Sequence, residues 1–323
     1  MTTHPVTQRP IVVGVDGSPH AAQALDWAAT EAALRGAPLV VIRAHPSDYR
    51  AARSTGPGEP ELSPPSSAIR AVATESCAEA VERARGLHPT LVVTGRTVTD
   101  DPGSAIVEAS TGAALVVVGA RGLGPVRELF LGSVSSYVTH GARCPVVVVR
   151  EAPSRTVADL RVVVGVDGSA TSSAALRFAF EAAARRGAGL TVVHTWDLDV
   201  ESSVATEAWS VDWPDPNEQE RVVVAEAIAG YAAEYATVDV RRHVVRGHAV
   251  AELVRQSENA ALLVVGTRGR GSVKALVLGS VSRGVLHDAH CPVAVVSTSR
   301  EPHAEAVGTA RPPDRHLPAT PSR

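Results

Sequence analysis

The 323-residue chain contains one sequence pattern twice, and this duplication constrains its fold more than any other feature. Residues 11–18 read IVVGVDGS and residues 162–169 read VVVGVDGS. Further along, VVGARG at 117–122 returns as VVGTRG at 264–269. Solenoid repeats run to about 20 to 50 residues, so a period of about 150 residues indicates a duplicated domain. We predict a first domain at 1–152, a second at 153–298 and a disordered, proline-rich tail at 299–323.

Composition narrows the class of protein further. Hydrophobic residues make up 45% of the chain, but no apolar run approaches the roughly 18 residues of a membrane span. Residues 1–10 are polar and lack the apolar core of a signal peptide, which favours a cytoplasmic protein. The net charge of −3 gives no sequence-wide attraction to nucleic acid. The three cysteines include no CxxC pair, which speaks against disulfides and a zinc site.

Within each copy, short apolar runs alternate with helical patterns. This alternation is typical of βαβ units and predicts an α/β fold with a parallel, five-stranded sheet in each copy, covered by helices on both faces. The predicted strands of the first copy are 11–15, 39–44, 91–94, 115–118 and 146–149, and those of the second begin at 162, 190, 238, 262 and 293. The stretches 46–67 and 197–217 break the pattern and are expected to be surface loops.

The first helix of each copy has start and stop signals. Ser18 can cap the helix with Pro19 at its first position, and Gly36 follows its last apolar residues. Ser169 and Gly187 occupy the same places in the second copy. Both helices are therefore expected to start directly after the Asp-Gly-Ser turn that ends the first strand.

The most specific motif is a glycine spacing that follows the fourth strand. The pattern G-x2-G-x9-G-S occurs once in each copy, at Gly119, Gly122, Gly132 and Ser133, and at Gly266, Gly269, Gly279 and Ser280. Glycines let the backbone turn tightly and approach an anion closely. The helix that the last glycine opens adds unpaired N–H groups, a dipole and two serine hydroxyls, all of which favour a bound phosphate. The alternative is that these glycines only shape tight turns.

With this motif, and with an aspartate ending the first strand, the chain resembles the universal stress protein family, specifically its ATP-binding tandem members. The resemblance covers residues 11–150 and 161–297. It implies Rossmann-like (adenine nucleotide alpha hydrolase-like) domains with strand order 3-2-1-4-5, pairing through the fifth strands, and one ATP per domain, with or without Mg²⁺. The nucleotide-binding residues that it implies are Gly14, Asp16, Ala44, Gly119, Arg121, Gly122, Leu123, Gly124, Gly132, Ser133, Val134 and Ser135, and then Gly165, Asp167, Thr195, Gly266, Arg268, Gly269, Arg270, Gly271, Gly279, Ser280, Val281 and Ser282.

Two pairs of charged residues in this set have more than one interpretation. Asp16 and Asp167 either bond the sugar or hold a magnesium ion, or else form Asx turns with their own backbone. Arg121 and Arg268 either bind phosphate through the guanidinium fork or are solvated loop charges. The histidines show no paired spacing of a metal site, and only His194, at the end of a second strand, lies near the expected adenine position.

The sequence excludes one common class of nucleotide-binding enzyme and disfavours a second. A P-loop ATPase requires Gly-Lys-Ser/Thr, but the sole lysine, Lys274, is followed by alanine. A Rossmann dehydrogenase requires G-x-G-x-x-G after its first strand, where both copies instead read Gly-Val-Asp-Gly-Ser.

Three functions remain. The favoured one is a regulatory or sensor module in a stress or dormancy response, in which ATP selects one of two conformations. The second is an enzyme that slowly hydrolyses ATP or transfers its phosphoryl group, with the two aspartates as the only identifiable bases. The third is an interaction scaffold in which nucleotide is structural. Expected partners are adenine nucleotide, an unidentified protein and a second copy joined through the fifth strands, although the tandem already supplies an internal pseudo-dimer.

Overall fold

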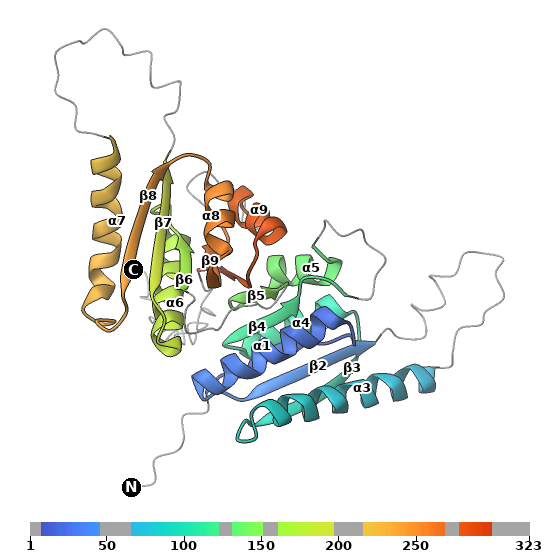
Figure 1. Cartoon of the computed structure of the whole chain (residues 1–323). Helices are drawn as coiled ribbons and strands as arrows, with labels where there is room; N and C mark the ends of the chain where they lie inside the picture. The colour runs from blue at the N-terminus through green and yellow to red at the C-terminus, as the bar shows by residue number, and fades with distance from the viewer. Residues whose placement is uncertain are drawn as a thin grey trace, which may run out of the picture.

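A computed structural model of the chain describes residues 8–45, 66–122, 131–150, 161–196, 216–268 and 278–298. In the first repeat the elements are β1 (Ile11–Gly14), α1 (Pro19–Arg35), β2 (Leu39–His45), α3 (Ser66–Leu87), β3 (Val93–Thr99), α4 (Pro102–Ala109), the 3-10 turn η1 (Ser110–Gly112), β4 (Leu115–Gly119), α5 (Ser133–Gly141) and β5 (Val146–Val149). In the second they are β6 (Arg161–Gly165), α6 (Ala170–Arg186), β7 (Leu190–Trp196), α7 (Pro216–Ala232), β8 (Val240–Arg246), α8 (Ala249–Ser257), β9 (Ala260–Gly266), α9 (Ser280–Asp288) and β10 (Val293–Val296). Figure 1 shows the two repeats side by side.

The strands of both repeats form a single sheet. Its order is β3-β2-β1-β4-β5-β10-β9-β6-β7-β8, so each repeat contributes strands in the order 3-2-1-4-5. Neighbouring strands within a repeat run parallel. The α/β fold class and the strand order are therefore confirmed.

The fifth strands of the two repeats pair with each other inside the chain. β5 and β10 run antiparallel, with Val148 opposite Val293 and Val146 opposite Val295. β5 has β4 on its other side, and β10 has β9. Both edges of each fifth strand are thus occupied, which counts against the expected homodimer through these strands.

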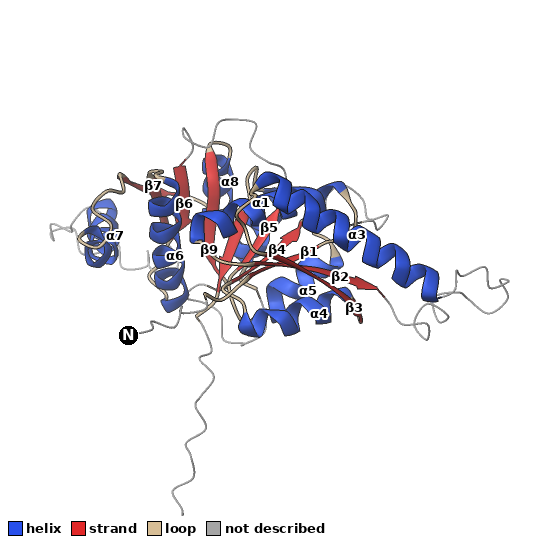
Figure 2. Ribbon diagram, turned by 90° about the horizontal axis from the view of Figure 1, so that it is seen from below, coloured by secondary structure: helices blue, strands red, loops and turns tan. Residues whose placement is uncertain are grey.

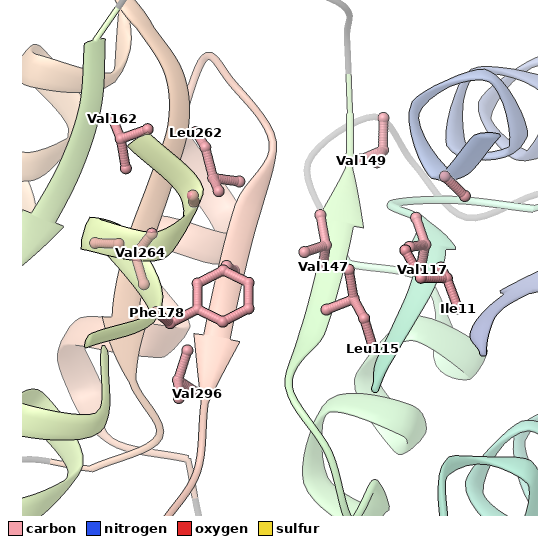
Figure 3. Packing of buried hydrophobic residues seen from close by; sticks show 14 of the residues in the cluster. Ile11, Leu115, Val117, Val147, Val149, Val162, Phe178, Leu262, Val264 and Val296 are labelled. Carbon is pink, nitrogen blue, oxygen red and sulfur yellow. The ribbon is translucent and has the colours of Figure 1, made fainter. Parts of the chain in front are cut away.

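Helices cover both faces of the sheet (Figure 2). On one face, buried side chains of α1, α3, α6 and α7 pack on the strands, and on the other those of α4, α5, α8 and α9 do so. Each of the two buried clusters contains residues of both repeats. Figure 3 shows residues of one cluster on both sides of the junction, with Val147 and Leu115 in the first repeat and Leu262 and Phe178 in the second. The hydrophobic core therefore continues across the junction of the repeats.

The cap predictions for the first helices are confirmed. The Ala21 N–H donates to Ser18 Oγ at 3.2 Å, and Gly36 ends α1 at a φ of 63°. Ser169 caps α6 in the same way, and Gly187 ends it at a φ of 60°. Glycine adopts this left-handed conformation without the strain that a side chain would add.

Most strand predictions agree with the structure to within two residues, but the third strand of the first repeat is placed wrongly. The prediction at 91–94 covers only the start of β3, which runs from Val93 to Thr99. β3 is an edge strand whose side chains are mostly exposed, so it lacks a continuous apolar run.

Several other predictions fall on parts of the chain that the structure does not describe. These are the boundary between 152 and 153, the tail at 299–323 and most of the two expected loops. The last two positions of each loop, 66–67 and 216–217, are the first turns of α3 and α7. Among the described residues, no helix has the length and apolar character to cross a membrane.

Candidate functional site

A cavity of about 220 Å³ opens at the carboxyl ends of β1, β2 and β4. Ligands of open α/β sheets bind at this position, where neighbouring connections leave the sheet on opposite faces. The predicted residues of the first repeat that the structure describes all line the cavity: Gly14, Asp16, Ala44, Gly119, Arg121, Gly122, Gly132, Ser133, Val134 and Ser135. The motif residues thus come together in space, from three strand ends and one helix start.

Sequence reasoning missed the apolar part of the cavity, which consists of Val15, Ala21, Ile42, Pro102, Ile106 and Val118. Ile42 could have been found, because side chains two residues apart in a strand share a face and Ala44 was predicted. Pro102 and Ile106 belong to α4, and no local pattern indicates which strand end this helix approaches. A Cβ on Gly14 would collide with Ile106, so the glycine allows α4 to approach β1 closely.

The glycines after β4 let backbone segments approach one another. A Cβ on Gly119 would lie 2.9 Å from the carbonyl carbon and oxygen of His20, in the first turn of α1. A Cβ on Gly132 would lie 3.2 Å from the Ala120 carbonyl oxygen. In the second repeat, Gly266 packs against Thr171 in the same manner. These glycines therefore allow close packing of the backbone, which is compatible with a ligand on the open side.

Asp16 and Asp167 both form Asx turns. The Ser18 N–H donates to Asp16 Oδ1 at 2.9 Å, and the Ser169 N–H donates to Asp167 Oδ1 at 3.0 Å. The second oxygen of Asp16, Oδ2, lies close to Gly122, where an added Cβ would collide with it. One carboxylate oxygen therefore holds the turn, while the other lies against the glycine loop beside the cavity.

Helices α5 and α9 begin with their backbone donors directed to the glycine loop. Gly132 and Gly279 are the N-cap residues, and neither has a side chain that could cap the helix. Their own N–H groups donate to the carbonyls of Ala120 and Thr267 at 2.8 Å. The N–H groups of the first helical turn have no intrahelical acceptor, and together with the helix dipole they favour an anion.

The second serine of each motif has a structural role that the sequence did not reveal. Ser135 Oγ donates to the carbonyl oxygens of Ala120 and Gly132 at 3.1 and 3.2 Å, and its side chain is buried. Ser282 Oγ donates to the Gly266 carbonyl at 2.7 Å. The Ser135 and Ser282 hydroxyls thus fix the loop to the helix, and their contact with a phosphate stays a prediction. The backbone N–H groups of Ser135 and Ser282 and the exposed Ser133 and Ser280 are further candidate donors to a phosphate.

The second repeat places its predicted residues at equivalent positions. Gly165 ends β6 and Asp167 follows it, and Thr195 lies near the end of β7. Gly266 ends β9, Arg268 follows it, and the segment from Gly279 to Ser282 opens α9. Thr171 Oγ1 donates to the Arg268 carbonyl at 2.6 Å, which ties this loop to α6. Leu123, Gly124, Gly269, Arg270 and Gly271 lie outside the described residues.

The two repeats differ at the end of their second strands. Arg43 Nη1 donates to the Val15 carbonyl at 3.3 Å, and the equivalent His194 places Nδ1 2.8 Å from the Val166 carbonyl. His194 Nε2 also lies 2.8 Å from a carboxylate oxygen of Glu220, on α7. His194 thus links β7 to α7 in the second repeat.

The described residues contain no cluster of three or more His, Cys, Asp or Glu side chains that could hold a metal ion. Mg²⁺ commonly binds through one or two carboxylates together with substrate phosphates, so a single aspartate suffices for such a site. Within the described ranges, Asp16 is the one carboxylate that lines the cavity.

Comparisons with known proteins agree with this architecture. The model of the universal stress protein family matches residues 8–150 and 160–297. A universal stress protein of Mycobacterium tuberculosis is 36% identical over 301 residues, which cover 91% of this chain and 99% of that protein. The crystal structure of a universal stress protein from Archaeoglobus fulgidus has a TM-score of 0.62 at 20% identity, covering 90% of this chain and 98% of that one. A structure of the universal stress protein from Archaeoglobus fulgidus in complex with dAMP covers 44% of this chain and 98% of that one at 28% identity, with a TM-score of 0.33. The chain belongs to the universal stress protein family.

Proposed function

We propose that each repeat binds one ATP and that the bound nucleotide makes this chain a regulatory or sensor module in a stress or dormancy response. The observation that carries the proposal is the cavity at the strand ends of the first repeat. It has an apolar part and a donor-rich part. A nucleotide has the same division, with a flat, weakly polar base at one end and anionic phosphates at the other.

The apolar part fits the base. Ile42, Ala44, Ile106 and Val118 come from two strands and α4 and form an apolar surface at one side. Ala44 is a small residue at the strand end and leaves its backbone close to a ligand. The cavity of about 220 Å³ is below the range of about 300–1,000 Å³ typical of small-molecule pockets, so ATP would extend out of it over the glycine loop.

The donor-rich part fits the phosphates. The first-turn N–H groups of α5 and the backbone between Gly119 and Gly122 lie at the same cavity, and Arg121 lines it as well. Anions at a helix N-terminus gain from both the free donors and the dipole. Asp16 would bond the ribose or, with phosphate oxygens, hold Mg²⁺ through its carboxylate, whose Oδ2 lies against the glycine loop.

The test starts from the small molecules that the freshly purified protein releases on denaturation, identified and quantified by chromatography and mass spectrometry. We expect one adenine nucleotide per repeat, mainly ATP. A folded sample that releases no nucleotide and does not bind added ATP would refute the proposal and leave the scaffold function.

Variants then separate a sensor from an enzyme. Asp16→Asn and Asp167→Asn keep an oxygen for the Asx turn and remove the charge, and Asp26→Asn, at a surface ion pair, is the matched control. ATP that stays intact for hours on the wild-type protein, with hydrogen exchange that differs between the ATP-bound and nucleotide-free forms, supports a sensor. Turnover that is lost in the site variants and kept in the control shows an enzyme instead.

A further inference from the structure

A second cavity, of about 350 Å³, lies at the amino ends of the strands in the second repeat. Arg161 is the first residue of β6, Thr191 and Arg241 are the second residues of β7 and β8, and Asn259 directly precedes β9. Arg242 alternates with Arg241 along β8, so its side chain lies on the other face of the sheet. The candidate nucleotide site lies at the carboxyl ends of the strands, and the two sites are therefore separate.

Arg161 is a fixed part of the cavity wall. It donates through Nε to Thr191 Oγ1 at 3.1 Å, through Nη1 to an Asp239 carboxylate oxygen at 2.6 Å, and through Nη2 to the Leu190 carbonyl at 2.8 Å. A Cβ on Gly189 would collide with this guanidinium, so the glycine makes room for it.

The charges at the cavity are matched. Arg241 Nε lies 3.7 Å from the Asp239 carboxylate, which also accepts the bond from Arg161. A second carboxylate, that of Glu252, lies 2.7 Å from His243 Nε2. Two arginines thus stand beside two carboxylates. An ion entering the cavity would lose water without meeting an unmatched opposite charge, so the wall favours a neutral ligand.

Three groups of the wall keep hydrogen-bonding capacity for such a ligand. Thr191 Oγ1 accepts the bond from Arg161, and within the described residues its own O–H donates to no acceptor. The Nη groups of Arg241 likewise donate to no group in the described part of the chain. Gln256 donates through Nε2 to Glu252 at 2.9 Å and leaves its amide oxygen to accept. Donors and an acceptor at one cavity match hydroxyl groups, each of which both donates and accepts.

The polar lining is specific to the second repeat. The strand registers and the repeat offsets identify the equivalent positions in the first repeat. Arg161, Thr191, Arg241, Gln256 and Asn259 correspond to Pro10, Val40, Thr94, Ala109 and Gly112. The fold does not require these polar groups, because the first repeat has the same fold without them.

We propose that this cavity binds a neutral, polyhydroxylated compound of the size of a monosaccharide. Neighbouring hydroxyls would accept bonds from Arg241 and Thr191 and donate to the amide oxygen of Gln256, and Val163 adds an apolar contact. Bonds from a charged guanidinium are stronger than those between neutral groups. The volume falls at the lower end of the range for small-molecule pockets, about 300–1,000 Å³.

The experiment titrates the full chain with three probes of similar ring size and follows the side-chain NMR signals of Arg241 and Gln256. Glucose carries several hydroxyls, glucuronate adds a negative charge, and tetrahydropyran-2-methanol keeps the ring with a single hydroxyl. We expect glucose to shift both signals and to bind roughly tenfold or more tightly than tetrahydropyran-2-methanol, because several hydrogen bonds are lost with the hydroxyls. Glucuronate should bind no more tightly than glucose. Tighter binding of glucuronate would overturn the neutral class, and equal binding of tetrahydropyran-2-methanol would overturn the role of the hydroxyls. No binding of any probe would overturn the site.

Variants that restore the residues of the first repeat locate the binding. Thr191→Val and Gln256→Ala should each weaken glucose binding by roughly three- to tenfold, the value of one hydrogen bond, and leave ATP binding unchanged. The control Thr94→Val removes a hydroxyl at the equivalent end of β3 in the first repeat and should bind glucose like the wild type.

The inference fails if glucose binding is unchanged in both site variants or is lost equally in the control. It also fails if Asp16→Asn/Asp167→Asn loses glucose binding, because the sugar would then occupy the candidate nucleotide site. Valine and alanine occupy the equivalent positions in the first repeat, so both site variants are expected to fold. Denaturation midpoints verify this.

Discussion

Gly119 shows how a motif residue can serve the fold and the site together. The backbone of β4 passes so close to the first turn of α1 that a Cβ at this position would lie 2.9 Å from two backbone atoms of His20. Backbone atoms cannot move aside as a flexible side chain can. We therefore expect Gly119→Ala to destabilise the protein by about 1–3 kcal/mol, the usual cost of overpacking.

The free energy of unfolding from urea titration checks this prediction. Gly86→Ala is the matched control, because Gly86 lies in α3 with no atom within 4 Å of the added Cβ. Alanine is a better helix former than glycine, so the control should be neutral or up to about 1 kcal/mol more stable. Equal stability of the two variants would show that β4 and α1 are not in contact at this point.

The cysteines are expected to be inert in the folded protein. All three are buried, and burial raises the pKa of the Cys144 and Cys291 thiols to about 12. Alkylation requires the thiolate and access to it. Iodoacetamide at pH 8 should leave Cys77, Cys144 and Cys291 unmodified in the native protein and label all three in denaturant, as measured by mass spectrometry. Rapid labelling of the native protein would mean that these sites open easily.

At the residue scale, the sequence predicts the donors of the candidate site better than its apolar wall. The glycines, Asp16 and the start of α5 follow from fixed spacings along the chain. Ile106 does not, because its place depends on how α4 packs on the sheet. The bond of the Ser135 hydroxyl to the Ala120 carbonyl was not predictable for a related reason, since this acceptor comes close only after the loop folds back on the helix.

Among the elements, α1 and α6 make a nearly symmetric contact between the repeats. The Arg35 guanidinium lies 5.4 Å from the ring centre of Phe178, and that of Arg186 lies 5.6 Å from the ring centre of Trp27. Arg35 and Arg186 are equivalent positions of the repeats, as are Trp27 and Phe178. A single buried carboxylate, Glu31, joins the two helices through ion pairs with both arginines.

Glu31 should make the stability of the chain depend on acid pH. Burial alone raises the pKa of Glu31, but the charges of Arg186 and Arg35 outweigh it, so the pKa lies below its ordinary value. A lowered folded-state pKa means that the carboxylate stabilises the fold above its unfolded value of about 4.3. This contribution is lost as the pH falls from that value through the folded-state pKa.

We expect Glu31→Gln to lower the free energy of unfolding at pH 7 by about 3–5 kcal/mol, because it leaves buried arginines without their counter-charge. The difference from the wild type should shrink below the unfolded pKa of glutamate. Denaturant titrations from pH 3 to pH 7 measure both effects. Asp26→Asn removes the exposed pair with Arg83 and should cost about 1 kcal/mol or less. A difference for Glu31→Gln that does not change with pH would contradict the assigned pKa.

The elements were predictable where they are buried on both faces. β5 and β10 agree with their predicted bounds residue for residue, because each is a continuous apolar run. The bounds of β3 were not predictable, since this strand lies at the edge of the sheet and has polar, exposed side chains. Edge strands commonly carry such residues, which prevent pairing with other chains.

On the scale of the whole molecule, the antiparallel pairing of β5 and β10 joins two domains into one sheet. Two copies of a single domain could form the same contact as a homodimer, and the tandem chain forms it internally. The sequence indicated this internal pseudo-dimer through the duplication, but it could not show whether the fifth strands meet within one chain or between two. The α1–α6 contact favours pairing within one chain, and it has no local sequence signal.

The full chain should therefore be a monomer, while fragment 1–152 should form a homodimer. In the fragment the apolar edge of β5 lacks β10, and an unpaired hydrophobic edge strand tends to pair with another chain. Light scattering after size-exclusion chromatography should give the full chain the mass of one 33.5 kDa copy and give the fragment twice its own mass. Mixing fragments 1–152 and 153–298 should convert homodimers into a mixed complex, because the second repeat has Ala182 at the position of Glu31, so that Arg186 gains its buried counter-charge only from the first fragment. A dimeric full chain, or a fragment 1–152 that stays monomeric while folded, would show that the fifth strands do not control the assembly of this protein.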